Sequence, residues 1–381
     1  MIYLDNAATT KVADQVLEAM LPYYKEFYGN PGSIHSQGLK AAEAVEKARE
    51  SIASSINAQP ENIIFTSGGS EANSLAILGV ADYLKKIGKR HIITTCVEHK
   101  SVLNSIKQLF HKDFECTFLN VSEQGYLSMD ELKQSIRPDT GLVSIMGMNN
   151  ETGNLYDVEK IGKICRTNNV LFHTDCVQAY GCIPIDVEEY NIDFLSASGH
   201  KIYATKGVGF LFARDKDMLA PIIYGGGQEF GLRSGTENVP GIVGFGVAAS
   251  LFTDTDCLYR TQYHNAHMRE VLLNELDSNI NDFRQNGVPC PESKIINLRF
   301  DGVDGETLLL LLNSSGVCVS SGAACNSHDS VPSHVLKSLG LTDEQARSSI
   351  RISFSPFTTL EETFNASSII VDSVKKLRGD W

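Results

Sequence analysis

The sequence lacks an excess of positive charge, and this absence excludes one broad class of function. Its 33 Lys and Arg residues stand against 46 Asp and Glu, which gives a formal net charge of −13. A protein that binds nucleic acid constitutively needs a basic face to displace counterions from the phosphates. We therefore expect no direct nucleic-acid partner.

Three further absences concern location. Residues 1–5 carry neither a basic nor an apolar leader segment, and no apolar run in the chain is long enough to cross a bilayer. The nine cysteines are odd in number and scattered over 381 residues, which is not the pattern of a disulfide framework. We expect a cytoplasmic protein with no signal peptide and no membrane partner.

The chain has no internal repeat and no nucleotide-binding motif of the GxGxxG or GxxxxGK(S/T) type. Strand-like and helix-like segments instead alternate through its first two thirds. Seven strands are predicted, at residues 62–66, 91–96, 116–121, 142–148, 170–174, 194–198 and 208–213. The helical segments between most of them imply crossover connections, and therefore an α/β fold with a mainly parallel sheet. The last strand follows a short link, so it could run antiparallel.

The pattern changes after a polar break at residues 254–256. A long helix is predicted at about 259–276. Short strands and helices follow, near residues 295–300, 317–320, 333–339, 350–354 and 360–377. This change predicts a domain boundary near residue 256.

Lys201 and Asp175 each follow a predicted strand. A lysine at a strand end can form a Schiff base, although most lysines are solvated surface residues. An acid at the carboxyl end of a buried parallel strand lies where open sheets bind ligands. It can pair with a protonated pyridine nitrogen, or simply cap a helix. Gln178 could reach a ring hydroxyl or act as the capping-box partner of Asp175.

Three turns offer weaker signals. The segment TSGGSE at residues 66–71 lets backbone N–H groups approach an anion, or is merely a tight connection. His99 could stack on a pyridine ring and serve as an acid–base group, or just begin a helix. In NNETG at residues 149–153, an Asn side chain could bind a ring oxygen, or the segment is an ordinary turn.

Two residues near the C-terminal end complete the candidates. Cys325 lies in the small, polar segment SSGAACNS, where a thiolate could attack if a cation is near, and His328 is the only local cation candidate. Cys325 and His328 together fall short of a zinc site. Arg351 could hold a carboxylate through two hydrogen bonds, or form an ordinary ion pair.

Taken in order, these segments resemble the cysteine desulfurases of the NifS/IscS type, in the class V aminotransferase group of fold-type I pyridoxal-phosphate (PLP) enzymes. The resemblance runs from residue 3 to about 377. Its marks are Gly29-Asn30-Pro31, TSGGSEAN (66–73), VEHKSV (97–102), NNETG (149–153), HTDCVQ (173–178), SGHKIY (198–203), GGGQEFGLRSGTENV (225–239), SSGAAC (320–325) and SSIRIS (348–353).

The resemblance implies a fold and a set of residue roles. A large domain, residues 14–256, would hold a mainly parallel seven-stranded sheet, and residues 1–13 with 257–381 would form a smaller α+β domain carrying a mobile cysteine loop. Lys201 would form the Schiff base with PLP. Phosphate contacts are implied for Gly69, Ser70, Ser198 and His200, with Thr236 donated by the partner subunit of a homodimer.

The remaining roles concern the ring and the substrate. Asp175 would face the pyridine nitrogen, Gln178 and Asn150 the ring oxygen, and His99 the ring face. Asn30, Asn150 and Arg351 would bind substrate. Cys325 would be the persulfide cysteine, and no metal is expected apart from transient iron–sulfur ligation by that residue.

The implied activity is conversion of L-cysteine to L-alanine, with sulfur passed to Cys325 and then to an acceptor protein for iron–sulfur cluster assembly or thiolation. Alternatives are a selenocysteine lyase or an aminotransferase on the same scaffold, or a non-catalytic interaction protein. The chain departs from its relatives at Gly69-Ser70, where Ala-Thr is frequent, and at Cys176, where Ala is usual.

Overall fold

The computed structural model describes residues 1–321 and 331–379. Its largest sheet has seven strands in the order β2-β8-β7-β6-β5-β3-β4. The strands are β2 (Ile63–Thr66), β3 (His91–Thr95), β4 (Glu115–Leu119), β5 (Thr140–Ser144), β6 (Leu171–Asp175), β7 (Phe194–Ser198) and β8 (Gly209–Ala213). β8 runs antiparallel to β2 and β7, and the other neighbours pair in parallel. The predicted α/β fold with a mainly parallel seven-stranded sheet is confirmed.

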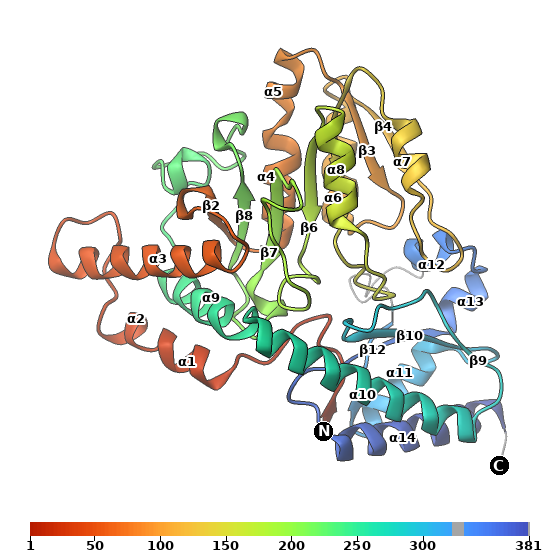
Figure 1. Cartoon of the computed structure of the whole chain (residues 1–381). Coiled ribbons are helices and arrows are strands. Elements are labelled where there is room, and N and C mark those ends of the chain that lie inside the picture. Colours follow the sequence, from red (N-terminus) through yellow and green to blue (C-terminus); the bar gives the residue numbers. More distant parts are fainter. Residues whose placement is uncertain (322–330, 380–381) are drawn as a thin grey trace.

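Helices cover both faces of this sheet (Figure 1). The helices of this region are α1 (Asp14–Met20), α2 (Pro22–Lys25), α3 (Ser36–Ser54), α4 (Gly69–Gly79), α5 (Ala81–Lys86), α6 (Lys100–Phe110), α7 (Met129–Ser135), α8 (Val158–Thr167) and α9 (Val239–Phe252), and α1 and α2 pack against α9. Short 3-10 turns are η1 (Pro60–Asn62), η2 (Gly199–Lys201), η3 (Lys216–Met218) and η4 (Glu229–Gly231).

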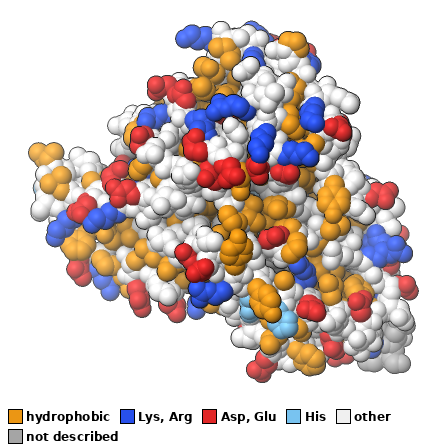
Figure 2. Space-filling model, in the orientation of Figure 1, with side chains coloured by type: hydrophobic (Ala, Val, Ile, Leu, Met, Phe, Trp, Pro, Cys, Tyr) orange, Lys and Arg blue, Asp and Glu red, His pale blue; other side chains and the backbone are white. Residues whose placement is uncertain are grey.

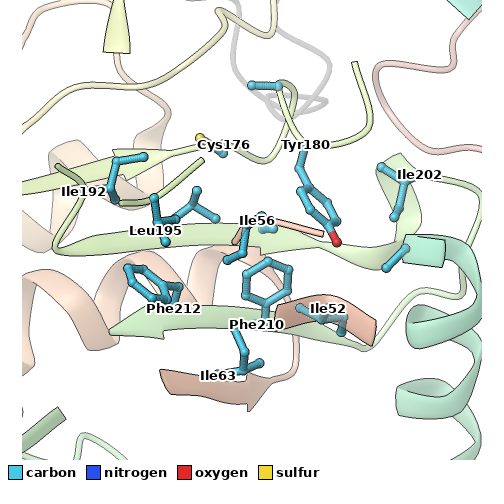
Figure 3. Close-up of a cluster of buried hydrophobic side chains, with 14 of the residues drawn as sticks. Ile52, Ile56, Ile63, Cys176, Tyr180, Ile192, Leu195, Ile202, Phe210 and Phe212 are labelled. Atoms are coloured by element: carbon cyan, nitrogen blue, oxygen red, sulfur yellow. The ribbon is translucent and has the colours of Figure 1, made fainter. Parts of the chain in front are cut away.

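Successive strand residues point to opposite faces, so each strand contributes to two apolar cores. Ile64 and Leu211 pack with α4, α5 and α6 on one face. Ile63, Phe210 and Phe212 belong to the core on the other face, with residues of α3, α8 and α9. Figure 3 shows part of this core, with Ile63, Phe210 and Phe212 near Ile52 of α3. β2 and β8 are buried at every position, which explains why they are apolar along nearly their whole length rather than at alternate positions.

The C-terminal third begins with α10 (Thr255–Asn279), whose first residues are capped by Asp254. It continues with β9 (Phe283–Gln285), β10 (Ile295–Phe300), α11 (Gly305–Ser314), β11 (Val317–Cys318), α12 (His334–Ser338), α13 (Asp343–Arg347), β12 (Ser349–Ser353) and α14 (Leu360–Arg378). β12, β10 and β9 form an antiparallel sheet, and β1 (Ile2–Tyr3) pairs in parallel with β11.

A separate apolar core holds this third together. Leu4 packs there with residues of α10, β10, β12 and α14, whereas Ala13 and Val16 belong to the core that contains Ile63 and Phe210. Figure 1 shows the N-terminus beside α14, at the opposite end of the molecule from the edge strand β4. The proposed division into residues 14–256 and residues 1–13 with 257–381 stays a prediction.

Two further features are the charges on the surface and the length and hydropathy of the helices. Charged side chains of both signs are interspersed over the face in view in Figure 2. Among the helices of residues 1–321 and 331–379, none alone is long and apolar enough to cross a membrane. One pair, α9 with α10, passes that test by length and composition only, with a bend of 76° between the two helices.

Candidate active site

A pocket of about 380 Å³ lies where β3, β5, β6 and β7 end and the C-terminal third meets the large sheet. Ligands in open α/β sheets bind at this edge, because the carboxyl ends of the parallel strands and the N-termini of the following helices open there. The pocket is lined by Ala7, Ala8, Gly69, Ser70, Asn73, His99, Lys100, Ser101, Met146, Met148, Asn150, Glu151, Asp175, Val177, Gln178, Ser198, His200, Lys201, Ser333, His334 and Arg351.

The pocket brings together most of the residues that the sequence singled out. Those that line it are Gly69, Ser70, His99, Asn150, Asp175, Gln178, Ser198, His200, Lys201 and Arg351. Asn30 and Thr236 are exposed and are not among the lining residues. Cys325 lies outside the described residues. The roles of all these residues stay predictions.

Lys201 reaches the N-terminal segment from the turn η2. Its Nζ donates hydrogen bonds to the carbonyl oxygens of Ala7 and Ala8, at 2.6 and 2.7 Å. Burial, followed by the positive charge of Lys201, lowers the pKa of the neighbouring His200 to about 4. His200 is therefore neutral at physiological pH.

The N-terminus of α4 has the geometry of an anion site. Its N-cap is Gly68, which has no side chain to satisfy the first N–H groups. A Cβ on Gly69 would lie only 2.4 Å from Cγ2 of Val177, so a larger residue would require a shift there. Unsatisfied N–H groups and the helix dipole favour an anion such as a phosphate.

The opposite part of the pocket contains Asp175 at the end of β6. Its Oδ1 accepts from the backbone N–H of Val177 at 2.9 Å, and its Oδ2 accepts from Nδ2 of Asn73 at 2.7 Å. Two buried oxygens beside it, Oδ1 of Asn73 and Oε1 of Gln178, have no hydrogen-bond partner within the described residues. Unpaired buried polar atoms are costly, so this end of the pocket is suited to a ligand with polar edges.

His99 is the N-cap of α6. Its Nδ1 lies 2.7 Å from Oγ of Ser101 and accepts from the Ser101 backbone N–H at 3.2 Å. This capping interaction holds the ring at the N-terminus of α6, where it lines the pocket. Its predicted roles, stacking on a pyridine ring and acid–base catalysis, stay predictions.

Arg351 enters from β12 and is 3% exposed. Its guanidinium donates to Oδ1 of Asp5 at 2.9 Å and to the carbonyl oxygen of Asn150 at 2.8 Å, while its buried Nε has no partner within the described residues. The arginine is thus ion-paired and also part of the pocket wall. The ion pair is therefore confirmed, and the substrate-binding role of Arg351 stays a prediction.

Several residues in the pocket or in contact with it escaped prediction. Glu151 accepts a hydrogen bond from Ser333, and burial raises its pKa to about 7. Asn73 and Ser101 connect Asp175 with His99, and Nζ of the buried Lys294 donates to the carbonyl oxygen of Lys201 at 2.9 Å. Asn73, Ser101 and Glu151 lie inside the motifs SEAN, HKS and NNETG, so motif proximity could have found them.

No cluster of three or more His, Cys, Asp or Glu side chains in residues 1–321 and 331–379 could hold a metal ion. The polar groups of the pocket instead comprise a lysine amine, a buried carboxylate, a helix N-terminus without a side-chain cap and an arginine. This set fits PLP, which carries an aldehyde, a pyridine nitrogen and a phosphate.

The chain belongs to the aminotransferase class-V family, whose profile matches residues 2–364. Within that class it is 45% identical over 383 residues to a cysteine desulfurase IscS of Ehrlichia chaffeensis, with 99% of this chain and 92% of the relative covered. The expected resemblance to the NifS/IscS group is confirmed.

Solved structures give the same result. A NifS-like protein superposes with a TM-score of 0.89 and 37% identity, covering 97% of this chain and 98% of its own. A structure described as SspA in complex with cysteine superposes with a TM-score of 0.81 and 37% identity, covering 94% of this chain and all of its own. Both similarities cover nearly the whole chain, so they concern the fold and the pocket together.

Proposed function

We propose that this protein is a PLP-dependent cysteine desulfurase, which converts L-cysteine to L-alanine and carries the sulfur as a persulfide on Cys325. The observation that carries the proposal is the convergence of the Lys201 amine, the Asp175 carboxylate and the uncapped N-terminus of α4 on one pocket. Full-length similarity to cysteine desulfurases supports it. A cytoplasmic location is part of the proposal.

Each wall of the pocket would hold one part of the cofactor. The N–H groups at Gly69 and Ser70, with Ser198 and His200, would bind the phosphate. Asp175 would pair with the pyridine nitrogen, and Gln178 and Asn150 would contact the ring oxygen. When bound, PLP supplies an electron sink for the electrons released at the substrate's Cα.

The protein's own groups would then position the substrate and move its protons. Arg351 would hold the α-carboxylate beside Asn150. The Lys201 amine, once released from the cofactor, would take the proton from Cα, and His99 would assist protonation. Lys201 and His99 both line the pocket, which supports these two roles.

Sulfur transfer would require Cys325 as a thiolate. Its Sγ attacks the substrate sulfur, so a sulfur–sulfur bond forms while the carbon–sulfur bond breaks. The electron pair of the carbon–sulfur bond stays with Cβ of the substrate, and protonation of that carbon gives L-alanine. Atoms and electrons balance without an external oxidant, since one thiol and cysteine yield one persulfide and alanine.

The partners follow from the same proposal. The persulfide would pass to an acceptor protein for iron–sulfur cluster assembly or thiolation. The chain would act as a homodimer in which Thr236 completes the phosphate site of the other subunit, since this exposed residue does not line its own pocket. Mixing Lys201→Ala and Thr236→Ala subunits should then restore part of the activity in mixed dimers.

The experiment that tests the function is incubation of the PLP-loaded protein with L-cysteine, followed by product and mass analysis. We expect L-alanine and a Cys325 peptide with one added sulfur. Cys325→Ser should lose sulfur transfer while it keeps the cofactor colour. A keto acid would indicate an aminotransferase, and a strong preference for selenocysteine would indicate a selenocysteine lyase. Either result would overturn the proposal.

A further inference from the structure

The helices α4 and α6 pack side by side, and the first turn of each opens into the pocket. Asn73 lies near the start of α4, Ser101 is the second residue of α6, and Asp175 ends β6 between them in the pocket wall. Asn73 is 1% exposed and Asp175 is 6% exposed. Hydrogen bonds among these side chains are therefore shielded from water and strongly directional.

The side-chain amide of Asn73 uses both of its hydrogens. Its Nδ2 donates to Oδ2 of Asp175 at 2.7 Å and to Oγ of Ser101 at 2.9 Å. A primary amide nitrogen has two donors and no acceptor, so both contacts are satisfied at once. The reverse orientation would place the amide oxygen against a carboxylate oxygen, which means that Asp175 itself fixes the orientation of Asn73.

This orientation of Asn73 favours one tautomer of the His99 imidazole. Because Oγ of Ser101 accepts from Asn73, its own hydrogen is available for Nδ1 of His99, 2.7 Å away. The backbone N–H of Ser101 points to the same nitrogen at 3.2 Å. Two donors converge on Nδ1, so that nitrogen is an acceptor and the ring proton of the neutral imidazole lies on Nε2.

We propose that Asn73 is a positioning residue that holds the carboxylate of Asp175 and the imidazole of His99 in one hydrogen-bonded chain. The importance of this hydrogen-bonded chain rests on the proposed function. In that function, the Asp175 carboxylate meets the edge of the PLP ring and the His99 imidazole meets its face. Asn73 thus sets the orientation of the carboxylate and the tautomer of the imidazole together.

The neighbouring residue Ser74 provides a matched control. Its Oγ lies 3.1 Å from Oγ of Ser105, so this pair also joins α4 to α6. Neither serine lines the pocket, and neither contacts Asp175 or His99 in the hydrogen bonds of the described residues. Loss of the Ser74–Ser105 contact reports helix packing alone.

The test compares Asn73→Leu, Ser101→Ala and Ser74→Ala through two measurements on the same proteins. The first is the 15N chemical shift of the His99 Nδ1 in the apoprotein, which reports how strongly that nitrogen accepts a hydrogen bond. The ten histidines are labelled together, and His99→Gln assigns the signal. The second is the affinity of the apoprotein for PLP, measured by absorbance titration.

We expect a crossed pattern. Ser101→Ala should move the Nδ1 signal toward that of a free acceptor nitrogen, Asn73→Leu should move it less in the same direction, and Ser74→Ala should leave it unchanged. Asn73→Leu should weaken PLP binding by about tenfold or more, the loss expected for one hydrogen bond to a charged group. Ser74→Ala should bind PLP as the wild type does, whereas Ser101→Ala keeps the Asn73–Asp175 hydrogen bond and should lose less affinity than Asn73→Leu.

Two results would overturn the inference. One is an Asn73→Leu protein with wild-type values in both measurements. The other is a Ser74→Ala protein whose Nδ1 chemical shift and PLP affinity change as much as those of Asn73→Leu. If Asn73→Leu does not fold, Ser101→Ala decides alone, because an unmoved Nδ1 signal in that folded variant contradicts the chain. Wild-type apoprotein that takes up no PLP would refute the proposed function, while the Nδ1 signal would still test the chain.

Discussion

The two walls of the pocket are built in different ways. One wall consists of strand ends and helix N-termini of a single sheet, and contributes His99, Asp175 and Lys201. The other consists of segments far apart in the chain, among them Ala7 near the N-terminus, Ser333, and Arg351 on β12. The first wall follows from the topology of the sheet, whereas the second exists only when the N-terminal segment and the C-terminal third dock against it.

The difference suggests a division of labour. The sheet-side wall carries the groups that would act on the cofactor, and its positions are fixed by buried strands. The opposite wall carries Arg351, which joins Asp5 and the backbone of Asn150 and so connects the two walls directly. Changes on the first wall should affect chemistry, and changes on the second should affect substrate binding.

The largest effect is expected on the sheet-side wall. Lys201→Ala removes the amine that would bind PLP covalently, so turnover should fall by about a thousandfold or more. Turnover of L-cysteine and thermal unfolding of the apoprotein are the measurements. The exposed Lys206→Ala is the control and should be fully active. A Lys201→Ala protein with substantial turnover would remove the distinction between the walls.

Arg351→Gln tests the opposite wall. The loss of a buried guanidinium that would clamp the substrate's carboxylate should raise KM and lower kcat/KM by about a hundredfold, with a smaller effect on kcat. Steady-state kinetics with L-cysteine measure this. Arg299→Gln removes a buried arginine from the adjacent strand β10 and should cost stability while KM stays unchanged. Equal KM effects in both variants would speak against a substrate role.

Glu98 offers a prediction about pH. Burial raises its pKa to about 8, so the folded protein binds this proton more tightly than the unfolded chain does. Stability should therefore fall as pH rises from about 4.5 through 8, by roughly 1 to 3 kcal/mol from this group. Denaturant unfolding at several pH values measures the slope.

Glu98→Gln imitates the protonated acid and should flatten this slope. The two proteins should be similar near pH 5 and diverge toward pH 8, and Glu151 should leave a residual slope of the same sign because burial raises its pKa as well. The exposed Glu123→Gln is the control and should behave as the wild type does. A variant with an unchanged slope would show that Glu98 ionises freely in the fold.

Lys294→Met should have the smallest effect. It removes the donor to the carbonyl oxygen of Lys201 but keeps most of the buried side-chain volume, so kcat should fall by about tenfold or less. Steady-state kinetics with L-cysteine measure kcat and KM separately. A change in KM without a change in kcat would place Lys294 with the substrate-binding wall.

The sequence predicted the sheet-side wall better than the opposite one. Lys201, Asp175 and His99 all follow strands with clear apolar patterns, so topology alone places them at one edge. Lys294 and Ser333 belong to no chemical motif, and their contacts with Lys201 and Glu151 arise from tertiary docking. Local patterns carry no signal for such contacts.

The same reasoning explains what the sequence could not give for the other candidates. Strand prediction extended β5 to residue 148, whereas the strand ends at Ser144 and the following residues turn into the pocket wall. Asn30 and Thr236 were assigned through the family resemblance, and neither lines the pocket of this chain. Their predicted roles rest on the family resemblance alone and stay predictions.

The central claim is that Lys201 binds PLP covalently in this pocket. The most direct measurement is borohydride reduction of the PLP-loaded protein, followed by mass analysis of its peptides. We predict one stable pyridoxyl-phosphate adduct, located on Lys201. An unmodified Lys201, or an adduct on another lysine with Lys201 intact, would contradict the account.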